Sequence, residues 1–324
     1  MTEIRRARDA LGFWAQRIGP IVGLEAAHQG WAGDETTTFT VTTECGERFI
    51  LKNIAGSLNA ERIGTEYDLL RHLHAFRVPV AVPVLPDSGQ LCVEDRERLY
   101  VLYPLLPADH TVPPTDVERV YANIGAAVAR LHSALAVYPG QVDSWTMNLR
   151  HTVFDEAIPR IQRALPGQDA DAFQRVVALL QDEMEAALED LPAQVIHGDC
   201  HGGNYLLYRG DVSGFVDLDH LPTGPRVYDI GYLLADMAKA QFFDIHAHRG
   251  WLGTFHHVIL GYQQENSLSR REKDALWFVM LATQVLFVDW FFQHQKDELA
   301  RKNLEAFYWI YGQRDEITHR IAGI

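Results

Sequence analysis

The sequence changes its hydrophobic pattern close to residue 105, and this change limits the folds that the chain can adopt. The stretch 36–54 is rich in Thr, Phe, Val and Ile around a central Cys-Gly turn, which predicts a β-hairpin. Apolar residues at helical spacing follow in 57–76, and the stretch 90–107 predicts two further strands. This order of strand, strand, helix, strand, strand indicates a small α+β unit.

The remainder of the chain is mainly helical by pattern. Long amphipathic stretches cover 153–190, 226–242, 251–265 and 271–318. Within this part, the segment 204–219 has two apolar runs joined by a turn of Gly, Asp and Ser, which predicts a second hairpin. We therefore expect a small β-rich lobe at 1–104 and a larger, mainly helical lobe at 105–324, with a hinge near Tyr103–Pro107.

Charge and cysteine usage restrict the class of function. The net charge of −14 leaves no basic surplus to neutralise the phosphates of a nucleic acid, so we expect no nucleic-acid partner. The same charge is compatible with a cationic substrate. Cys45, Cys92 and Cys200 are widely separated and form no CxxC motif, which disfavours a disulfide framework or zinc knuckle and fits a reducing cytoplasm.

Two segments bear on localisation. The stretch 1–20 lacks the apolar run and the cleavage site of a signal peptide. The most apolar stretch, 275–292, is interrupted by Thr283, Gln284 and Asp289, which favours a buried helix over a membrane span. We therefore predict a cytoplasmic protein without a membrane partner.

The densest group of chemically reactive side chains is the motif HGDCHGGN at His197–Asn204. Asp199 precedes Asn204 by five residues, and Asp217 follows at the end of the second predicted hairpin. Phosphoryl transfer needs a carboxylate that orients the attacking hydroxyl, and hard oxygen ligands for the Mg²⁺ that bridges the nucleotide phosphates. An aspartate and an asparagine in one loop, with a second aspartate across a hairpin, supply both.

The longer stretch 195–237 resembles the signature of the aminoglycoside phosphotransferase/choline kinase-like superfamily. The shared pattern is HGDxHxxN, then an apolar strand that ends in Asp, then a Gly-containing turn and an Asp that opens a helix. Upstream, IGAAVARLHSAL resembles the family's helix with a Leu-His ending. The resemblance spans about 36–240 and implies a bilobal protein-kinase-like fold of the α+β class.

The resemblance also implies a reaction and its cofactor. The chain would be a kinase that uses Mg²⁺ and moves the γ-phosphate of ATP, or of GTP, to a hydroxyl of a small molecule. An antibiotic, an amino alcohol, an amino acid and a sugar are all open as the acceptor. The sequence determines neither the acceptor, nor the preferred nucleotide, nor the oligomeric state.

The family's roles carry over to the matching positions of the motif. Asp199 would be the catalytic base, and Asn204 and Asp217 would be the Mg²⁺ ligands. The residues that would support the loop are His197, His201 and Asp229. Asp229 would do so through backbone hydrogen bonds at the start of its helix. Asp219, two residues after Asp217, is a further candidate for the metal shell.

In the first lobe the resemblance assigns nucleotide-binding residues. Lys52 ends a predicted strand and Glu66 lies on the next helix, an order that resembles the kinase Lys–Glu pair whose lysine contacts the α- and β-phosphates. Tyr103 and Leu105 belong to LYVLYPLLP, the segment expected to bind adenine. No GxGxxG motif occurs, and the stretch 28–39 offers Gly30 and Gly33 for a phosphate-covering loop.

Two residues bear on the kind of acceptor. Gly198 stands where protein kinases have the arginine that holds a phosphorylated activation segment, which favours a small-molecule kinase over a Ser/Thr protein kinase of the same superfamily. Asp289 is a carboxylate in an aromatic run and needs a partner if buried, so one hypothesis places it in the acceptor pocket.

A two-metal hydrolase is an alternative function, and it could use six side chains: His197, Asp199, His201, Asp217, Asp219 and His220. That alternative leaves Asn204 and the Lys52–Glu66 pair without a role.

Overall fold

The structure, a computed structural model, describes residues 3–29, 37–54, 60–95, 98–109, 116–140, 142, 145–218, 221–243 and 251–324. The chain forms two compact units. The first unit consists of Met1–Ala108, Tyr138–Asp143 and Ser213–Asp219. The second unit consists of Asp109–Val137, Ser144–Val212 and His220–Ile324.

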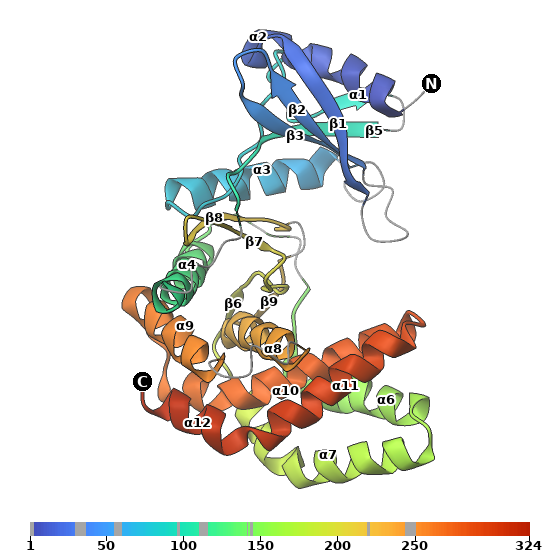
Figure 1. Ribbon diagram of the computed structural model, residues 1–324, viewed down its shortest axis with the longest axis vertical. Helices are drawn as coiled ribbons and strands as arrows, with labels where there is room; N and C mark the ends of the chain where they lie inside the picture. The colour runs from blue at the N-terminus through green and yellow to red at the C-terminus, as the bar shows by residue number, and fades with distance from the viewer. Residues whose placement is uncertain are drawn as a thin grey trace. The chain divides into compact units, whose positions relative to one another are not determined.

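A five-stranded antiparallel sheet in the order β1-β2-β3-β5-β4 forms the frame of the first unit (Figure 1). Its strands are β1 (Ile21–Gln29), β2 (Thr37–Thr43), β3 (Arg48–Asn53), β4 (Val93–Asp95) and β5 (Arg98–Pro104). The predicted hairpin is confirmed, because β2 and β3 pair with Thr38 opposite Lys52. The two strands predicted in 90–107 are β4 and β5, and the helix predicted in 57–76 is α3 (Ala60–Ala75).

The sequence patterns did not predict β1 or the helical segment before it. That segment consists of α1 (Glu3–Leu11), η1 (Gly12–Trp14) and α2 (Ala15–Ile18). Trp14 is fully buried, and its indole Nε1–H donates to the carbonyl of Val84 at 2.6 Å. β1 contains Gly23, Glu25 and two alanines, which have low strand propensity, so its conformation depends on pairing with β2.

The second unit is mainly helical, with two short sheets. Its helices are α4 (Val117–Ala136), α5 (Leu149–His151), the π-helix η2 (Thr152–Ala157), α6 (Ile158–Ala164), α7 (Gly167–Leu188), α8 (Val227–Phe243), α9 (Trp251–Glu265), α10 (Arg270–Gln293), α11 (Asp297–Gly312) and α12 (Arg314–Ala322). One sheet pairs β6 (Ala193–Val195) with β9 (Thr223–Pro225). The second predicted hairpin is confirmed as β7 (Tyr205–Tyr208) and β8 (Asp211–Phe215), and β8 crosses from the second unit into the first.

Two predicted helical stretches are divided in the structure. The stretch 153–190 breaks at Leu165, which is extended at φ −77° and ψ 143° because a residue before proline disfavours the helical region. The stretch 271–318 is three helices, and the first break contains Gln295 at φ 55°. Helical periodicity continues through such breaks in the sequence, so the pattern predicted the helices but not their ends.

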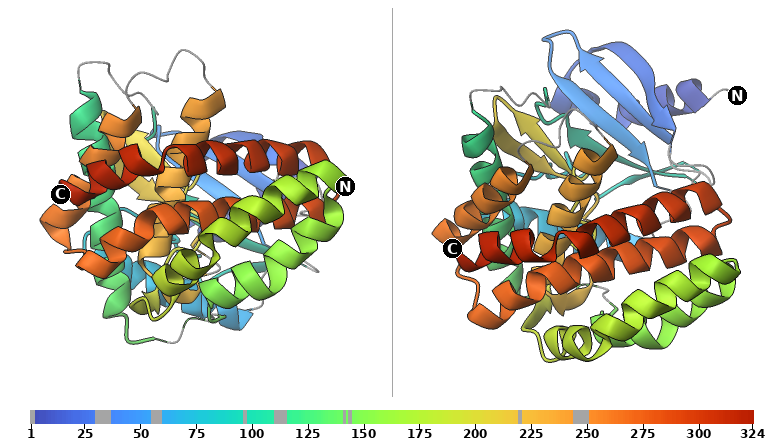
Figure 2. Two further views of the ribbon diagram at one scale, coloured as in Figure 1. Left: turned by 90° about the horizontal axis from the view of Figure 1, so that it is seen from below. Right: turned by 60° about the horizontal axis from the view of Figure 1, so that its bottom comes forward.

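The apolar helix α10 is the centre of the second unit. It lies alongside α11 and also packs against α6, α7 and α8 (Figure 2). The helix is long and apolar enough to cross a membrane, but 78% of its most apolar window is buried inside the protein. This is the burial that the interrupted apolar run predicted. A Ser269–Glu272 capping box begins the helix, which satisfies N–H groups that have no partner within the helix.

Helices α4 and α9 cross through glycine. A Cβ added to Gly125 of α4 would lie 1.9 Å from the carbonyl oxygen of Val258, and one added to Gly261 of α9 would lie 1.9 Å from that of Ala122. Both contacts are with helix backbone, which cannot rotate away. The two backbones therefore approach more closely than any larger residue permits.

We predict that Gly125→Ala and Gly261→Ala each lower the free energy of unfolding by about 1–3 kcal/mol, the usual cost of overpacking. Circular dichroism during chemical denaturation measures this change. Gly167→Ala is the matched control, because it also lies in a helix but a Cβ there would meet nothing within 4 Å. Unchanged stability of both crossing variants would show that the helices can separate without cost.

Candidate active site

The loop His197–Asn204, named the HGD loop here, lies between β6 and β7 in the second unit. Gly198 has φ 78°, and a Cβ there would lie 2.5 Å from the ring of Pro222. The position therefore needs glycine for its backbone conformation and for space. The arginine that protein kinases have at this position would not fit here.

Asp199 carries its carboxylate between two hydrogen-bond donors. The side-chain amide of Asn204 donates to Asp199 Oδ2 at 2.7 Å and to its backbone carbonyl at 2.9 Å. The hydroxyl of Tyr232, on α8, donates to Oδ1 at 2.7 Å. The ring nitrogen Nε2 of His201 lies 3.6 Å from Oδ2. The loop thus brings together the predicted base, the predicted metal-binding amide and one supporting histidine.

The surroundings of Asp199 keep it ionised. Burial by itself raises the pKa of the carboxyl, but the His201 ring and the Tyr232 hydroxyl outweigh this effect. Together with the Asn204 amide they lower the pKa to about 2. The side chain is therefore a carboxylate at neutral pH, and it can accept a hydrogen bond from an alcohol. Cys200 is buried, which raises the pKa of its thiol, so the thiol is not activated as a nucleophile.

Asp229, near the start of α8, holds the beginning of the loop. Its carboxylate accepts the backbone N–H of His197 and that of Gly198, each at 2.8 Å. These are the backbone hydrogen bonds expected of this position from the resemblance. His201 lies further along the loop, where its Nδ1 accepts the N–H of Gly203 at 3.0 Å.

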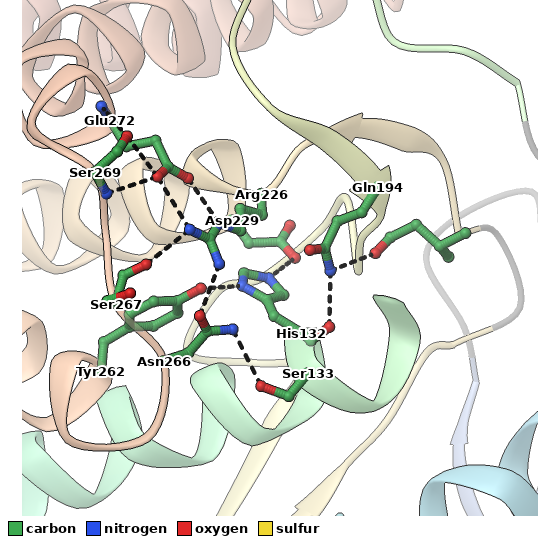
Figure 3. Close-up of polar contacts among 11 residues, drawn as sticks. His132, Ser133, Gln194, Arg226, Asp229, Tyr262, Asn266, Ser267, Ser269 and Glu272 are labelled. Atoms are coloured by element: carbon green, nitrogen blue, oxygen red, sulfur yellow. Dashed lines mark hydrogen bonds and ion pairs between the residues drawn. The ribbon is translucent and has the colours of Figure 1, made fainter. Parts of the chain in front are cut away.

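A buried polar network extends behind Asp229 (Figure 3). Nε2 of His132 lies 2.9 Å from Asp229 Oδ2, and its Nδ1 lies 2.9 Å from the hydroxyl of Tyr262. Arg226 forms an ion pair with Glu272, and its Nη1 donates to Asn266 Oδ1 at 2.8 Å. A carboxylate only accepts, so the Nε2–H of His132 donates to Asp229, and the Tyr262 hydroxyl donates to Nδ1 of the ring.

Local sequence patterns did not predict the partners in this network. His132 and Tyr262 each have ordinary helical neighbours, and they lie 130 residues apart along the chain. The hydroxyl of Tyr232 on Asp199 was equally unpredicted. These contacts come from the packing of α4, α8 and α9, and the one relevant signal was the Leu-His ending of the helix that contains His132.

The predicted nucleotide-binding residues lie in the first unit. Lys52 is on β3 and Glu66 on α3, and these two described side chains form no ion pair with each other in this structure. Instead Glu66 Oε1 accepts from the hydroxyl of Tyr103 at 3.0 Å. The N–H of Leu105 donates to the carbonyl of Arg48 at 3.0 Å, so a nucleotide contact at Leu105 would use its carbonyl or its side chain.

The remaining predicted metal ligand, Asp217, follows β8 and belongs to the first unit. It is exposed and has φ 62°, a left-handed conformation that costs energy for a residue other than glycine. Asp219, Gly30 and Gly33 lie outside the described residues, so their predicted roles have no structural counterpart here. Over the part of the chain that is described, no group of three His, Cys, Asp or Glu side chains is arranged to hold a metal ion.

The donor types nevertheless fit Mg²⁺. The amide nitrogen of Asn204 is engaged with Asp199, which leaves its carbonyl oxygen as the ligand atom. Asp217 offers an exposed carboxylate, and both atoms are hard oxygen donors.

Asp289 is buried and has a basic partner. The guanidinium of Arg160 donates from Nε to both carboxylate oxygens at 3.0 Å and from Nη2 to Oδ2 at 2.8 Å. Gln293, one turn later on α10, donates to Oδ2 at 2.8 Å. The partner that this buried carboxylate requires is thus the guanidinium of Arg160, which contacts both of its oxygens. The hypothesis that Asp289 lines an acceptor pocket stays a prediction.

Known proteins resemble this chain over most of its length. The model of the phosphotransferase enzyme family matches residues 28–259. Homoserine kinase of Neisseria meningitidis is 29% identical over 262 residues, which cover 79% of this chain and 78% of that one. The serine/threonine protein kinase RdoA of Salmonella typhimurium is 23% identical over 286 residues, 86% of this chain and 80% of that one.

A solved structure has the same fold. An amicoumacin kinase in complex with AMP-PNP, Ca²⁺ and Ami superposes with a TM-score of 0.67 at 20% identity, over 95% of this chain and 93% of that one. The likeness shows the predicted kinase-like fold, with a β-rich unit and a helical unit. The chain therefore belongs to the phosphotransferase enzyme family, and it is a kinase with a hydroxyl acceptor.

Proposed function

We propose that the protein transfers the γ-phosphate of ATP to a hydroxyl group of a small molecule. The observation that carries this proposal is the HGD loop, in which an ionised Asp199 lies against the amide of Asn204. In the kinase template, a carboxylate orients the attacking hydroxyl and a nearby asparagine binds Mg²⁺, and these two residue types lie side by side in the loop. The name of homoserine kinase, a relative at 29% identity, indicates such a small hydroxyl-bearing acceptor.

The chemical role of Asp199 follows from its position. The acceptor hydroxyl donates its hydrogen bond to the carboxylate, which orients the oxygen toward the γ-phosphorus. As the new O–P bond forms and the bond to the β-phosphate oxygen breaks, Asp199 takes the proton and ADP leaves. Mg²⁺, held by Asn204 and Asp217, would neutralise the charge on the phosphates.

The other predicted residues have supporting roles in this proposal. Lys52 would contact the α- and β-phosphates, and Glu66 would hold it once the nucleotide is bound. The segment with Tyr103 and Leu105 would bind adenine, and Asp219 would belong to the metal shell. The residues that would keep the HGD loop in shape are His197, His201 and Asp229.

We also propose that residues 1–104 form the nucleotide-binding lobe and that residues 105–324 form the acceptor-binding lobe. The enzyme would be cytoplasmic and would have no nucleic-acid or membrane partner.

Two observations favour a small acceptor over a protein. Gly198 has no room for the arginine through which protein kinases hold a phosphorylated activation segment. The link from Asp217 to Val227, where α8 begins, is short for a segment that holds an extended peptide. Because one relative is a serine/threonine protein kinase, a protein acceptor is the alternative that the experiment must address.

We predict that Asp199→Asn lowers kcat by about 10²–10⁴, the usual contribution of a positioned general base. Binding of Mg·ATP, measured by calorimetry, and the melting temperature should stay close to wild type, because the change is isosteric. A variant with wild-type turnover would exclude Asp199 as the base.

We predict that Asp217→Asn abolishes the Mg²⁺ dependence of ATP binding. Asparagine tolerates the left-handed conformation at φ 62°, so this change removes the charge without adding backbone strain. Asp190→Asn is the matched control, because Asp190 is also exposed and left-handed at φ 48°. Calorimetric titration of ATP with and without Mg²⁺ compares the two variants, and the Asp190 variant should keep the Mg²⁺ dependence of the wild type. Tight Mg·ATP binding by the Asp217 variant would contradict its role as a ligand.

The acceptor class is tested by labelled γ-phosphate in two parallel reactions. One contains pooled amino acids, amino alcohols, sugars and antibiotics with free hydroxyls, and the other contains generic protein substrates. We expect label on a small molecule. Label on Ser or Thr of proteins, with no small-molecule product, would support the protein kinase instead.

A further inference from the structure

One face of helix α8 contacts the HGD loop at three points. Asp229, Tyr232 and Asp236 are spaced by three and four residues, so their side chains lie on the same face of the helix. Asp229 accepts the N–H groups at the start of the loop. Asp236 Oδ2 accepts the N–H of Gly202, further along the loop, at 2.9 Å. The backbone of the loop is therefore held on both sides of Asp199.

Tyr232 acts between these two carboxylates and on a different target. Its hydroxyl donates to the side chain of Asp199, at Oδ1 and 2.7 Å, and not to the loop backbone. The backbone bonds place the Cα of Asp199, but they leave rotation about the side-chain bonds free. A hydrogen bond to the carboxylate is what restricts that rotation.

The two oxygens of Asp199 are held from two separate elements. Oδ2 accepts from Asn204, which belongs to the loop itself, and Oδ1 accepts from Tyr232 on α8. Nε2 of His201 lies 3.6 Å from Oδ2, the oxygen that also accepts from Asn204, so Tyr232 donates to the opposite oxygen of the carboxylate. If the Tyr232 hydroxyl were removed, Asn204 and His201 would still lie at Oδ2, but Oδ1 would lose its donor on α8, and the carboxylate could turn about Oδ2.

The ring of Tyr232 is itself fixed by packing. It is buried, with ring centroids 5.1 Å from Phe287 on α10, 6.0 Å from Tyr228 and 5.8 Å from His201. Burial and the charge of Asp199 raise the pKa of the Tyr232 hydroxyl far above neutral pH, so it remains a donor. A rigid donor on a helix can define the direction of the group that accepts from it.

We propose that Tyr232 is a positioning residue for phosphoryl transfer, whose hydroxyl sets the orientation of the Asp199 carboxylate toward the acceptor alcohol. This inference rests on the proposed role of Asp199 as the base. It extends that role to a residue of another element, and it assigns a function to the tyrosine that lies between the two loop-binding aspartates of α8.

The test is Tyr232→Phe, which keeps the ring contacts and removes one hydrogen bond to a charged group. We expect kcat to fall about 10-fold to 100-fold, as the loss of such a bond predicts, while the KM for Mg·ATP and the melting temperature stay within about twofold and a few degrees of wild type. Tyr228→Phe is the matched control. Tyr228 is one helical turn earlier and is also buried, but none of the hydrogen bonds to Asp199 comes from it.

A double-mutant cycle with Asp199→Asn distinguishes positioning from a general structural effect. If Tyr232 acts through Asp199, the phenylalanine change costs its full factor in the wild-type background and almost nothing in the Asp199→Asn background. An equal loss in both backgrounds, or wild-type kcat for Tyr232→Phe, overturns the inference. If Tyr232→Phe melts at a clearly lower temperature, Tyr232→Met takes its place in the cycle, because it also fills the buried space without a hydroxyl.

The same cycle keeps this inference separate from the proposed function. A wild-type-like Asp199→Asn variant would reject the base assignment, and with it the premise for Tyr232. A strongly impaired Asp199→Asn variant beside a fully active Tyr232→Phe variant would retain the proposed function and reject only the positioning role.

Discussion

The carboxylate of Asp229 is fully buried, and its hydrogen bonds determine the conformation of the HGD loop. It accepts hydrogen bonds from two backbone N–H groups of the loop and from the Nε2–H of His132. A buried carboxylate is costly unless each of its lone pairs has a partner, so the loop and the histidine must be in place when α8 packs. The geometry around Asp199 therefore depends on a side chain thirty residues later in the chain.

The network around Asp229 joins several helices of the second unit to the loop. His132 comes from α4, Tyr262 from α9 and Glu272 from the first turn of α10, and Arg226 lies just before α8. The glycine crossing of α4 and α9 allows these helices to approach closely enough for His132 and Tyr262 to meet. The polar network behind Asp229 therefore depends on the glycines at the helix crossing.

The predicted site residues divide between the two units. Asp199, Asn204 and their supporting residues belong to the second unit, whereas Lys52, Glu66, Tyr103 and Asp217 belong to the first. In the first unit the hydroxyl of Tyr103 is hydrogen-bonded to Glu66, a contact that the expected Lys–Glu pair did not include. Asp217 has a left-handed backbone at φ 62°, a conformation that a residue other than glycine adopts at an energetic cost.

The sequence alone was sufficient to predict the two-part fold, both hairpins, most of the helical segments and the group from His197 to Asn204, because periodicity and short motifs are local properties. The strand β1 and the helix ends were not predictable, since a weak strand former pairs only when a neighbouring strand is present. Tyr232, His132 and Asp236 could not be assigned either. Their contacts join residues about thirty to a hundred positions apart, and no local pattern records which helix face will meet which loop. Eight consecutive residues were thus enough to propose a chemistry for the loop, whereas the hydrogen bond from Tyr232 to its carboxylate depends on the packing of α8.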